Sequence, residues 1–229
     1  WPDAPPLDTE LGFLYLAAAR PDEARAAFER ALRAAPTSTN GRYGLVTSRV
    51  TAGQFDAARS SLEDWRSAAP GDVQLAVLSA RLDLADGKTQ SAEQTLQDAV
   101  RRTSGDPDAA EALADLYLAT GNRTAALKYY EQVAARLGRP VGTLVAIGIL
   151  KQEAGDVTGA RRAYERALAL DRPAAVAANN VAWLDAADGN LPQAVELAER
   201  AAAGAPESAQ VLDTLGWMYH LAGKSDQAI

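Results

Sequence analysis

The chain has 229 residues, of which 48% are hydrophobic and only 6% aromatic, and it contains 51 alanines and no cysteine. This surplus of small apolar side chains predicts closely packed helices. The formal net charge of −7 disfavours nucleic acid as a partner, since phosphate backbones would be repelled on average. The lack of cysteine excludes disulfides and cysteine-based metal sites, and no apolar run approaches the roughly 18 residues that cross a bilayer.

The N-terminal end of the chain has an unusual composition. The chain starts at Trp1 rather than Met, and prolines stand at positions 2, 5 and 6. We interpret residues 1–4 as the tail of a preceding segment that belongs to a longer parent protein.

From residue 5 onward, two residue types recur with a period of 34. Glycine occupies six positions at this spacing, and alanine occupies seven positions that each lie five residues after the place of the glycine. The glycines are Gly53, Gly87, Gly121, Gly155, Gly189 and Gly223, and the alanines are Ala24, Ala58, Ala92, Ala126, Ala160, Ala194 and Ala228. In the first unit Ala19 takes the place of the glycine. Two series in phase define one repeated structural unit.

The apolar residues of each unit have the spacing of two helices joined at the glycine, which can adopt the positive φ that ends a helix. Pairs three residues apart on the first helix are predicted to face inward: Leu11/Leu14, Leu113/Leu116, Ile147/Leu150, Val181/Leu184 and Leu215/Met218. On the second helix a larger residue lies four places after the alanine: Phe28, Leu62, Leu96, Tyr130 and Tyr164. Each unit is therefore predicted to be a helical hairpin with small residues packed against large ones.

These residues resemble the tetratricopeptide repeat (TPR) family. Leu11-Gly12, Tyr15, Ala24, Phe28, Ala31 and Pro36 reproduce the family pattern in the first unit, and Leu215-Gly216, Tyr219 and Ala228 reproduce its start in the last. The resemblance implies an all-α fold, a right-handed superhelical α-solenoid of helix-turn-helix repeats. We expect six complete units at 5–38, 39–72, 73–106, 107–140, 141–174 and 175–208, and a truncated seventh at 209–229. The third unit departs most from the pattern, with Ser79, Ala80 and Asp83 at key positions.

Catalysis finds no support in the residues. The single histidine, His220, excludes a histidine pair for zinc, and the carboxylates show no repeated inward pairing. The glycines never cluster as in a phosphate-binding loop. We expect no catalytic residue, no cofactor and no metal.

Recognition of a partner at the protein surface remains as the candidate function. The resemblance implies that the first helices line a concave binding face. On this face Trp183 and Trp217 hold equivalent positions one repeat apart, and neighbouring asparagine amides can hydrogen-bond an extended peptide. The predicted partner-binding residues are Asn179, Asn180, Trp183, Asp213, Thr214, Trp217 and His220. The alternative is that both tryptophans pack between first helices, as we expect for Trp65 on a second helix.

The family's tyrosine position carries charged residues in four units. Arg49 and Lys151 alternate there with Asp83 and Asp185, which predicts the ion pairs Arg49/Asp83 and Lys151/Asp185 between adjacent first helices.

The sequence thus predicts a non-catalytic scaffold for a protein or peptide partner, neutral or basic in charge. Two alternatives stay open: a self-assembling spacer that forms homo-oligomers through its solenoid ends, and the interaction region of a larger enzyme. Residues 179–184 and 211–217 also resemble the C-terminal repeats of bacterial TPR lipoproteins of exopolysaccharide export. This favours the bacterial periplasm or envelope over the cytoplasm.

Overall fold

The computed structural model describes residues 5–69, 71–136, 141–171, 174–224 and 226, and within them it is built from α-helices without strands. The predictions for residues 1–4, for Ala228 and for the end of the truncated seventh repeat lie outside the described residues. The helices are α1 (Pro5–Ala17), α2 (Pro21–Ala34), α3 (Thr39–Thr51), α4 (Phe55–Ala68), α5 (Val73–Ala85), α6 (Thr89–Arg102), α7 (Pro107–Ala119), α8 (Arg123–Arg136), α9 (Val141–Glu153), α10 (Val157–Leu170), α11 (Ala175–Ala187), α12 (Leu191–Gly204) and α13 (Ala209–Leu221). The chain divides into two compact units, residues 1–116 and 117–229. We call these the first unit and the second unit, and we call each 34-residue helical hairpin a repeat.

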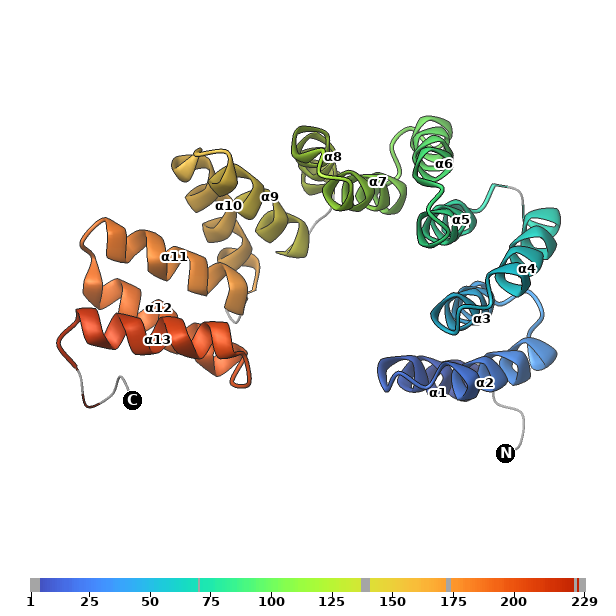
Figure 1. Cartoon of the computed structure of the whole chain (residues 1–229), viewed down its shortest axis with the longest axis horizontal. Helices are drawn as coiled ribbons and strands as arrows, with labels where there is room; N and C mark the ends of the chain where they lie inside the picture. Colours follow the sequence, from blue (N-terminus) through green and yellow to red (C-terminus); the bar gives the residue numbers. More distant parts are fainter. Residues whose placement is uncertain (1–4, 70, 137–140, 172–173, 225, 227–229) are drawn as a thin grey trace. The chain divides into compact units, whose positions relative to one another are not determined.

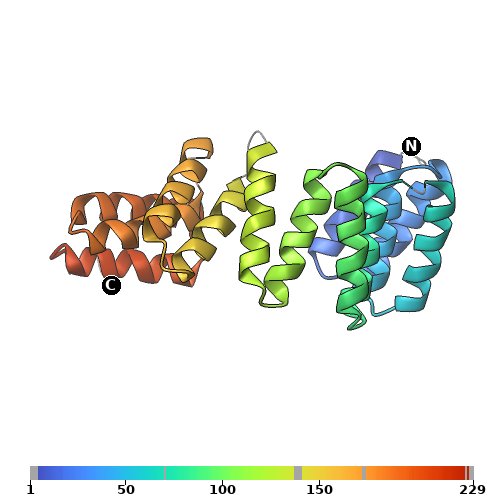
Figure 2. The same ribbon diagram turned by 90° about the horizontal axis from the view of Figure 1, so that it is seen from above.

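The odd-numbered helices, which we call first helices, begin 34 residues apart, and each described second helix comes after its partner and a short turn (Figures 1 and 2). All six periodic glycines have φ between 71° and 82°, and Ala19 has φ 56° in the same place. The glycine prediction is therefore confirmed: each of these turns places one residue in the left-handed region, where a Cβ atom is disfavoured. Pro36 and Pro206 lie in turns between helices, and Pro192 lies in the first turn of α12.

The predicted packing of small against large residues is also confirmed. Ala24, Ala58, Ala92, Ala126, Ala160 and Ala194 are completely buried, and the five larger residues four places further on are all buried. Around Phe28 the fit requires glycine, because a Cβ atom added at Gly12 or Gly44 would lie 2.6 or 2.1 Å from the ring. Small residues thus let paired helices approach closely.

One member of a predicted inward pair, Leu14, is placed wrongly, whereas Leu11 is partly buried. Leu14 is 66% exposed, whereas its equivalents Leu82, Leu116, Leu150, Leu184 and Met218 are buried. In α3, α5, α9, α11 and α13, the preceding second helix packs against the first helix. No described second helix precedes α1, so Leu14 and likewise Leu7, 62% exposed, face solvent.

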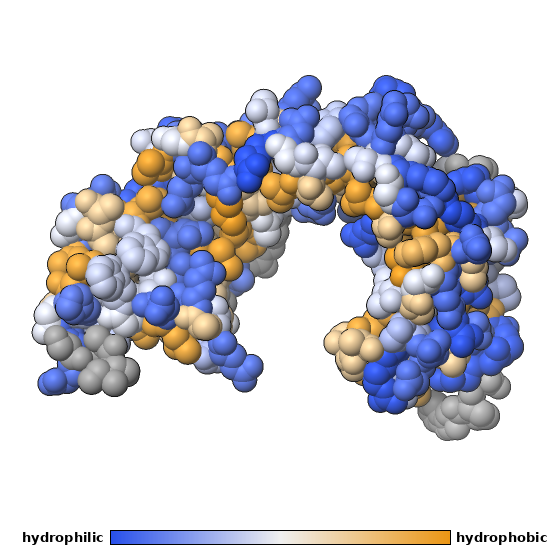
Figure 3. Space-filling model, viewed as in Figure 1, coloured by the Kyte–Doolittle hydropathy of each residue, from blue (hydrophilic) through white to orange (hydrophobic). Residues whose placement is uncertain are grey.

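Within the first unit, a core cluster joins α3, α4 and α5. Trp65 is 2% exposed in this cluster, among Leu62, Leu75 and Leu78, and its indole Nε1 donates to Asp72 Oδ2 at 3.2 Å. The prediction that Trp65 is a packing residue is confirmed. The surface drawn in Figure 3 is largely hydrophilic, with separate apolar patches.

Candidate functional site

The predicted partner-binding residues lie on α11 and α13, which pack against each other within the second unit. Trp183 on α11 is 42% exposed and Trp217 on α13 is 47% exposed. The alternative in which both rings are packed away between first helices is therefore wrong. Two large aromatic rings meet solvent at equivalent positions one repeat apart.

The exposed ring of Trp183 is held in place from the neighbouring helix. Its indole Nε1 donates to Thr214 Oγ1 at 3.1 Å, and the threonine hydroxyl donates to the Gln210 carbonyl at 2.9 Å. Thr214 is 4% exposed, so its part in the cluster is to support the tryptophan rather than to meet a partner. This arrangement fixes one edge of the indole ring and leaves the apolar face available.

Trp217 has a different neighbour. The His220 ring lies nearly one helical turn further along α13, with ring centroids 5.4 Å apart and an interplanar angle of 35°. His220 and Asp213 are both exposed. Together with Trp217 they give the α13 surface an aromatic ring, an imidazole and a carboxylate.

The two asparagines are placed differently from each other. Asn179 is 4% exposed, and its side-chain Oδ1 has no hydrogen-bond partner, while Asn180 is partly buried. The structure therefore does not bring Asn179 to the open surface beside the tryptophans, because its position on α11 turns it toward the neighbouring helices. A buried carbonyl oxygen without a hydrogen-bond donor costs about 1–3 kcal/mol, so Asn179 Oδ1 is an unusual feature of α11.

A second aromatic group lies on the first helices of the other unit. The Phe13 ring packs edge-on against Phe28 at a centroid distance of 5.0 Å and lies 6.5 Å from the Tyr43 ring. Tyr43 also accepts a hydrogen bond from Arg81 Nη1 at 2.6 Å. Phe13, Tyr43 and Arg81 are not among the predicted partner-binding residues. The 34-residue register of the face positions was the signal that could have joined them.

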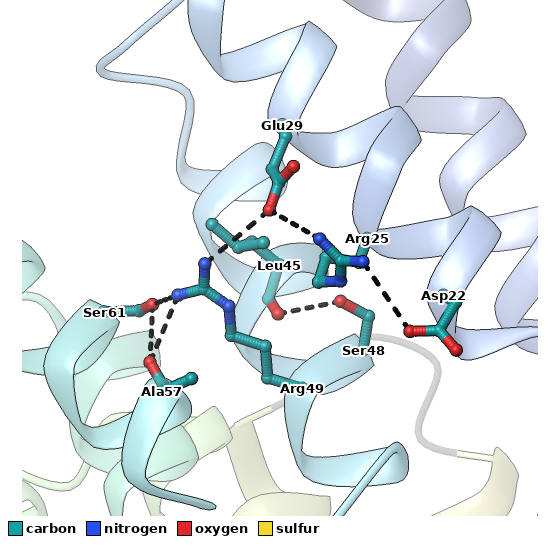
Figure 4. Close-up of polar contacts among 8 residues, drawn as sticks. All are labelled: Asp22, Arg25, Glu29, Leu45, Ser48, Arg49, Ala57 and Ser61. Atoms are coloured by element: carbon teal, nitrogen blue, oxygen red, sulfur yellow. Dashed lines mark hydrogen bonds and ion pairs between the residues drawn. The ribbon is translucent and has the colours of Figure 1, made fainter. Parts of the chain in front are cut away.

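The predicted ion pairs between adjacent first helices are wrong. Arg49 instead approaches Glu29 on α2 at 3.7 Å and donates to the Ala57 carbonyl and the Ser61 hydroxyl on α4 (Figure 4). Lys151 pairs with Glu131 on α8 at 2.9 Å. The side chain at this position points toward the flanking second helices, not toward the next first helix, so its partner comes from there.

The two aspartates obey the same rule with the opposite charge. Arg59 on α4 reaches Asp83 at 2.9 Å and Asp86 at 2.6 Å, and Arg161 on α10 reaches Asp185 at 2.5 Å and Asp188 at 2.8 Å. Hydrogen bonding to Asp83 is the main cause that raises the pKa of Arg59, and Asp185 does the same for Arg161. These two triads are three repeats apart in sequence and use equivalent positions in both units.

Other chemistry finds no site in the described part of the chain. No group of three or more His, Asp or Glu residues there is arranged to hold a metal ion. The helices that the structure describes also include none with the length and hydropathy needed to cross a membrane.

The geometry defines a class: an all-α helical-repeat protein. Comparison with family models matches the tetratricopeptide repeat at residues 6–82, 83–140 and 145–209. The chain belongs to the tetratricopeptide repeat family, and in general terms it is a protein-interaction scaffold. No curated protein matches it.

Several solved structures are similar in fold. Yeast Tom70 has a TM-score of 0.77 at 18% identity over 89% of this chain and 44% of that chain. A chain of the APC/C hetero-tetramer Cut9–Hcn1 has a TM-score of 0.66 at 17% identity, over 95% of this chain and 43% of that chain. PilF of Pseudomonas aeruginosa has a TM-score of 0.65 at 16% identity, over 90% of this chain and 94% of the PilF chain. The chain thus spans less than half the length of the Cut9–Hcn1 and Tom70 chains that it matches.

Proposed function

We propose that the second unit binds a protein or peptide partner on the face of its first helices, with Trp183 and Trp217 as aromatic anchors. The observation that carries this proposal is the 42% and 47% exposure of two tryptophans at equivalent positions. Tryptophan is enriched among the residues that contribute most to binding, because its ring buries a large area at little cost in conformational entropy.

The polar residues around the anchors set the character of the partner. Asp213 contributes an exposed carboxylate, and Trp183 is held in one orientation by Thr214. None of the seven candidate residues is Lys or Arg. A neutral or basic peptide segment therefore suits this face better than an acidic one.

Affinity capture from lysate and envelope extract of the source organism tests the proposal. The intact chain is compared with a triple variant, Asn180→Ala/Trp183→Ala/Trp217→Ala, and with a control, Val157→Ala/Leu212→Ala, which removes two exposed apolar side chains outside the cluster. We expect a partner retained by the intact chain and the control and lost from the triple variant at unchanged helicity. Equal retention by all three proteins would refute the anchor role.

We also propose a narrower setting, bacterial envelope or exopolysaccharide secretion machinery. It rests on the resemblance of residues 179–184 and 211–217 to repeats of envelope lipoproteins. The identity of the captured partner tests it: an envelope or secretion component supports this setting, and a cytoplasmic partner contradicts it.

Self-association is a second candidate, favoured by the exposed Leu7 and Leu14 on α1. Their equivalents Val211 and Met218 on α13 are buried, and α13 packs against α12. If the α1 face binds another copy, the molar mass measured by light scattering rises with concentration, and Leu7→Glu/Leu14→Glu abolishes the rise. A constant monomer mass would contradict self-association.

A further inference from the structure

A pocket of about 560 Å³ lies in the second unit, between the face of α9, the first half of α11 and the start of α13. Its apolar lining includes Ile149, 39% exposed, and Val176, 51% exposed. Pockets of this size commonly receive ligands that combine apolar and polar groups. Trp183 and Trp217 do not line this pocket, so it is distinct from the exposed aromatic anchors.

The polar lining is dominated by primary amides. Four of them line the pocket: Gln152, Asn179, Asn180 and Gln210. Among these four described side chains, only the Gln152 amide has a side-chain hydrogen bond, in which Oε1 accepts from the Tyr164 hydroxyl at 3.1 Å. An amide both donates and accepts, which is the pattern needed to pair with a peptide backbone.

Asn179 gives the clearest sign that the pocket takes an occupant. It is 4% exposed, and its Oδ1 is buried without a hydrogen-bond partner. Such a group is destabilising in the unbound protein, and a bound donor would remove that penalty.

The charges of the lining narrow the ligand class. No described lining residue is Lys or Arg, and the one carboxylate, Glu153, is paired with Arg123 at 2.6 Å. A bound carboxylate or phosphate would find no cation among the lining residues. The exposed apolar side chains are aliphatic, and the one aromatic residue of the lining, Tyr164, is 1% exposed, so little ring surface is open for a sugar to stack on.

We propose that this pocket is a specificity site for an uncharged, extended peptide segment. One aliphatic or aromatic side chain of the segment sits against Ile149 and Val176, and its backbone pairs with the amides of Asn179, Asn180 and Gln210. The inference rests on the proposed peptide-binding function and adds which part of the peptide is selected and where.

A random dodecapeptide library displayed on phage, panned on the whole chain, provides the probe. Enriched peptides are synthesised, and their Kd values are measured for the wild type and four variants. Val176→Asp places a charge in the pocket, and Val157→Asp is its matched control, since Val157 is 50% exposed and lies outside the lining. Asn179→Leu removes the unpaired amide, and Trp217→Ala tests the anchor.

We expect the enriched peptides to share one large apolar residue without flanking acidic residues. Val176→Asp and Asn179→Leu should each weaken binding about tenfold or more, while Val157→Asp changes it less than about twofold. Asn179→Leu should leave the melting temperature unchanged or raise it, because it buries no unsatisfied polar group. If Asn179 had a purely structural role, the substitution Asn179→Leu would instead lower the melting temperature.

The outcomes separate this inference from the proposed function. Peptides weakened by Trp217→Ala but unaffected by Val176→Asp and Asn179→Leu would overturn the pocket inference and leave the anchor proposal standing. Consensus peptides with an obligatory carboxylate, or enrichment no higher than on the Val176→Asp protein, would also overturn it.

Discussion

Ala19 lies in the turn between α1 and α2 and shows how much free energy a side chain costs at a positive φ. With a φ of 56°, this alanine takes the place that glycine holds in the other described repeats. The backbone hydrogen bonds around Ala19 match those around Gly53. A Cβ atom in this region costs roughly 1–2 kcal/mol. No heavy atom lies within 4 Å of a Cβ added at Gly53, so the penalty there comes from the backbone alone.

We therefore expect Ala19→Gly to raise the free energy of unfolding by about 1 kcal/mol, despite the extra chain entropy of glycine. Gly53→Ala should lower it by a similar amount. Urea titrations monitored by circular dichroism measure both. A shift of the two variants in the same direction would contradict the conformational explanation.

Tyr164 carries a pH dependence. Burial is the main cause that raises its pKa to about 12 from the ordinary value of 10, with a smaller contribution from the charge of Glu153. A raised pKa means that the folded state favours the protonated phenol, so this stabilisation is complete below pH 10 and is lost as the pH rises toward 12. Tyr164→Phe cannot ionise.

At about pH 8 we expect Tyr164→Phe to be less stable than the wild type by about 0.5–1.5 kcal/mol, because the hydrogen bond to Gln152 is lost. Between pH 10 and 12 this gap should narrow, since only the wild type has a phenol to ionise at position 164. Thermal melts of both proteins across this range test the prediction. A gap that widens with pH would contradict it.

At the scale of helices, a large part of the fold could be predicted from the sequence. The 34-residue series of glycine and alanine identifies the turns and the closest helix contacts because φ and side-chain volume at those places are strict requirements. The partners of Asp83 and Asp185 could not be predicted, since equal spacing does not reveal which neighbouring helix a side chain faces. For the site, spacing identified the two tryptophans, but it did not predict the burial of Asn179.

The charged contacts between repeats should help to fix helix register. The Asp83 side chain is 12% exposed and is held by Arg59 on α4 and by Ser91 on α6. A double-mutant cycle with Arg59→Ala and Asp83→Ala should give a coupling of about 1 kcal/mol. The exposed pair Arg66/Glu63 is the control and should give about 0–0.5 kcal/mol. Equal couplings would show that burial of the aspartate adds nothing.

Ser79 marks a local weakness in α5, at the inward position where the other helices carry larger apolar residues. It lines a partly open pocket of about 280 Å³ in the first unit, and its hydroxyl has no hydrogen-bond partner. Ser79→Leu should raise the free energy of unfolding by about 1–2 kcal/mol by filling this space and removing the buried hydroxyl. Ser79→Ala, which removes only the hydroxyl, should recover less, and denaturant titration distinguishes the two. A less stable leucine variant would mean that the pocket cannot accept the side chain.

For the whole molecule, the contacts predict a stability that varies along the chain. Every well-packed helix pair among the described residues joins helices one or two places apart in sequence order. No single core then holds the described helices together, and a local defect should spread mainly to neighbouring helices. Trp65→Ala in the first unit and Leu144→Ala in the second each delete a buried side chain, and each should cost about 2–5 kcal/mol.

Amide hydrogen exchange of the whole chain distinguishes local from global destabilisation. With Trp65→Ala we expect faster exchange in α3, α4 and α5, whose residues form the cluster around Trp65, and unchanged exchange in α11 to α13. Leu144→Ala should accelerate α9 and its packing partners α8 and α10 and spare α1 to α4. Uniform acceleration of every helix by either variant would require coupling through the entire chain, and nearest-neighbour packing alone could not account for it.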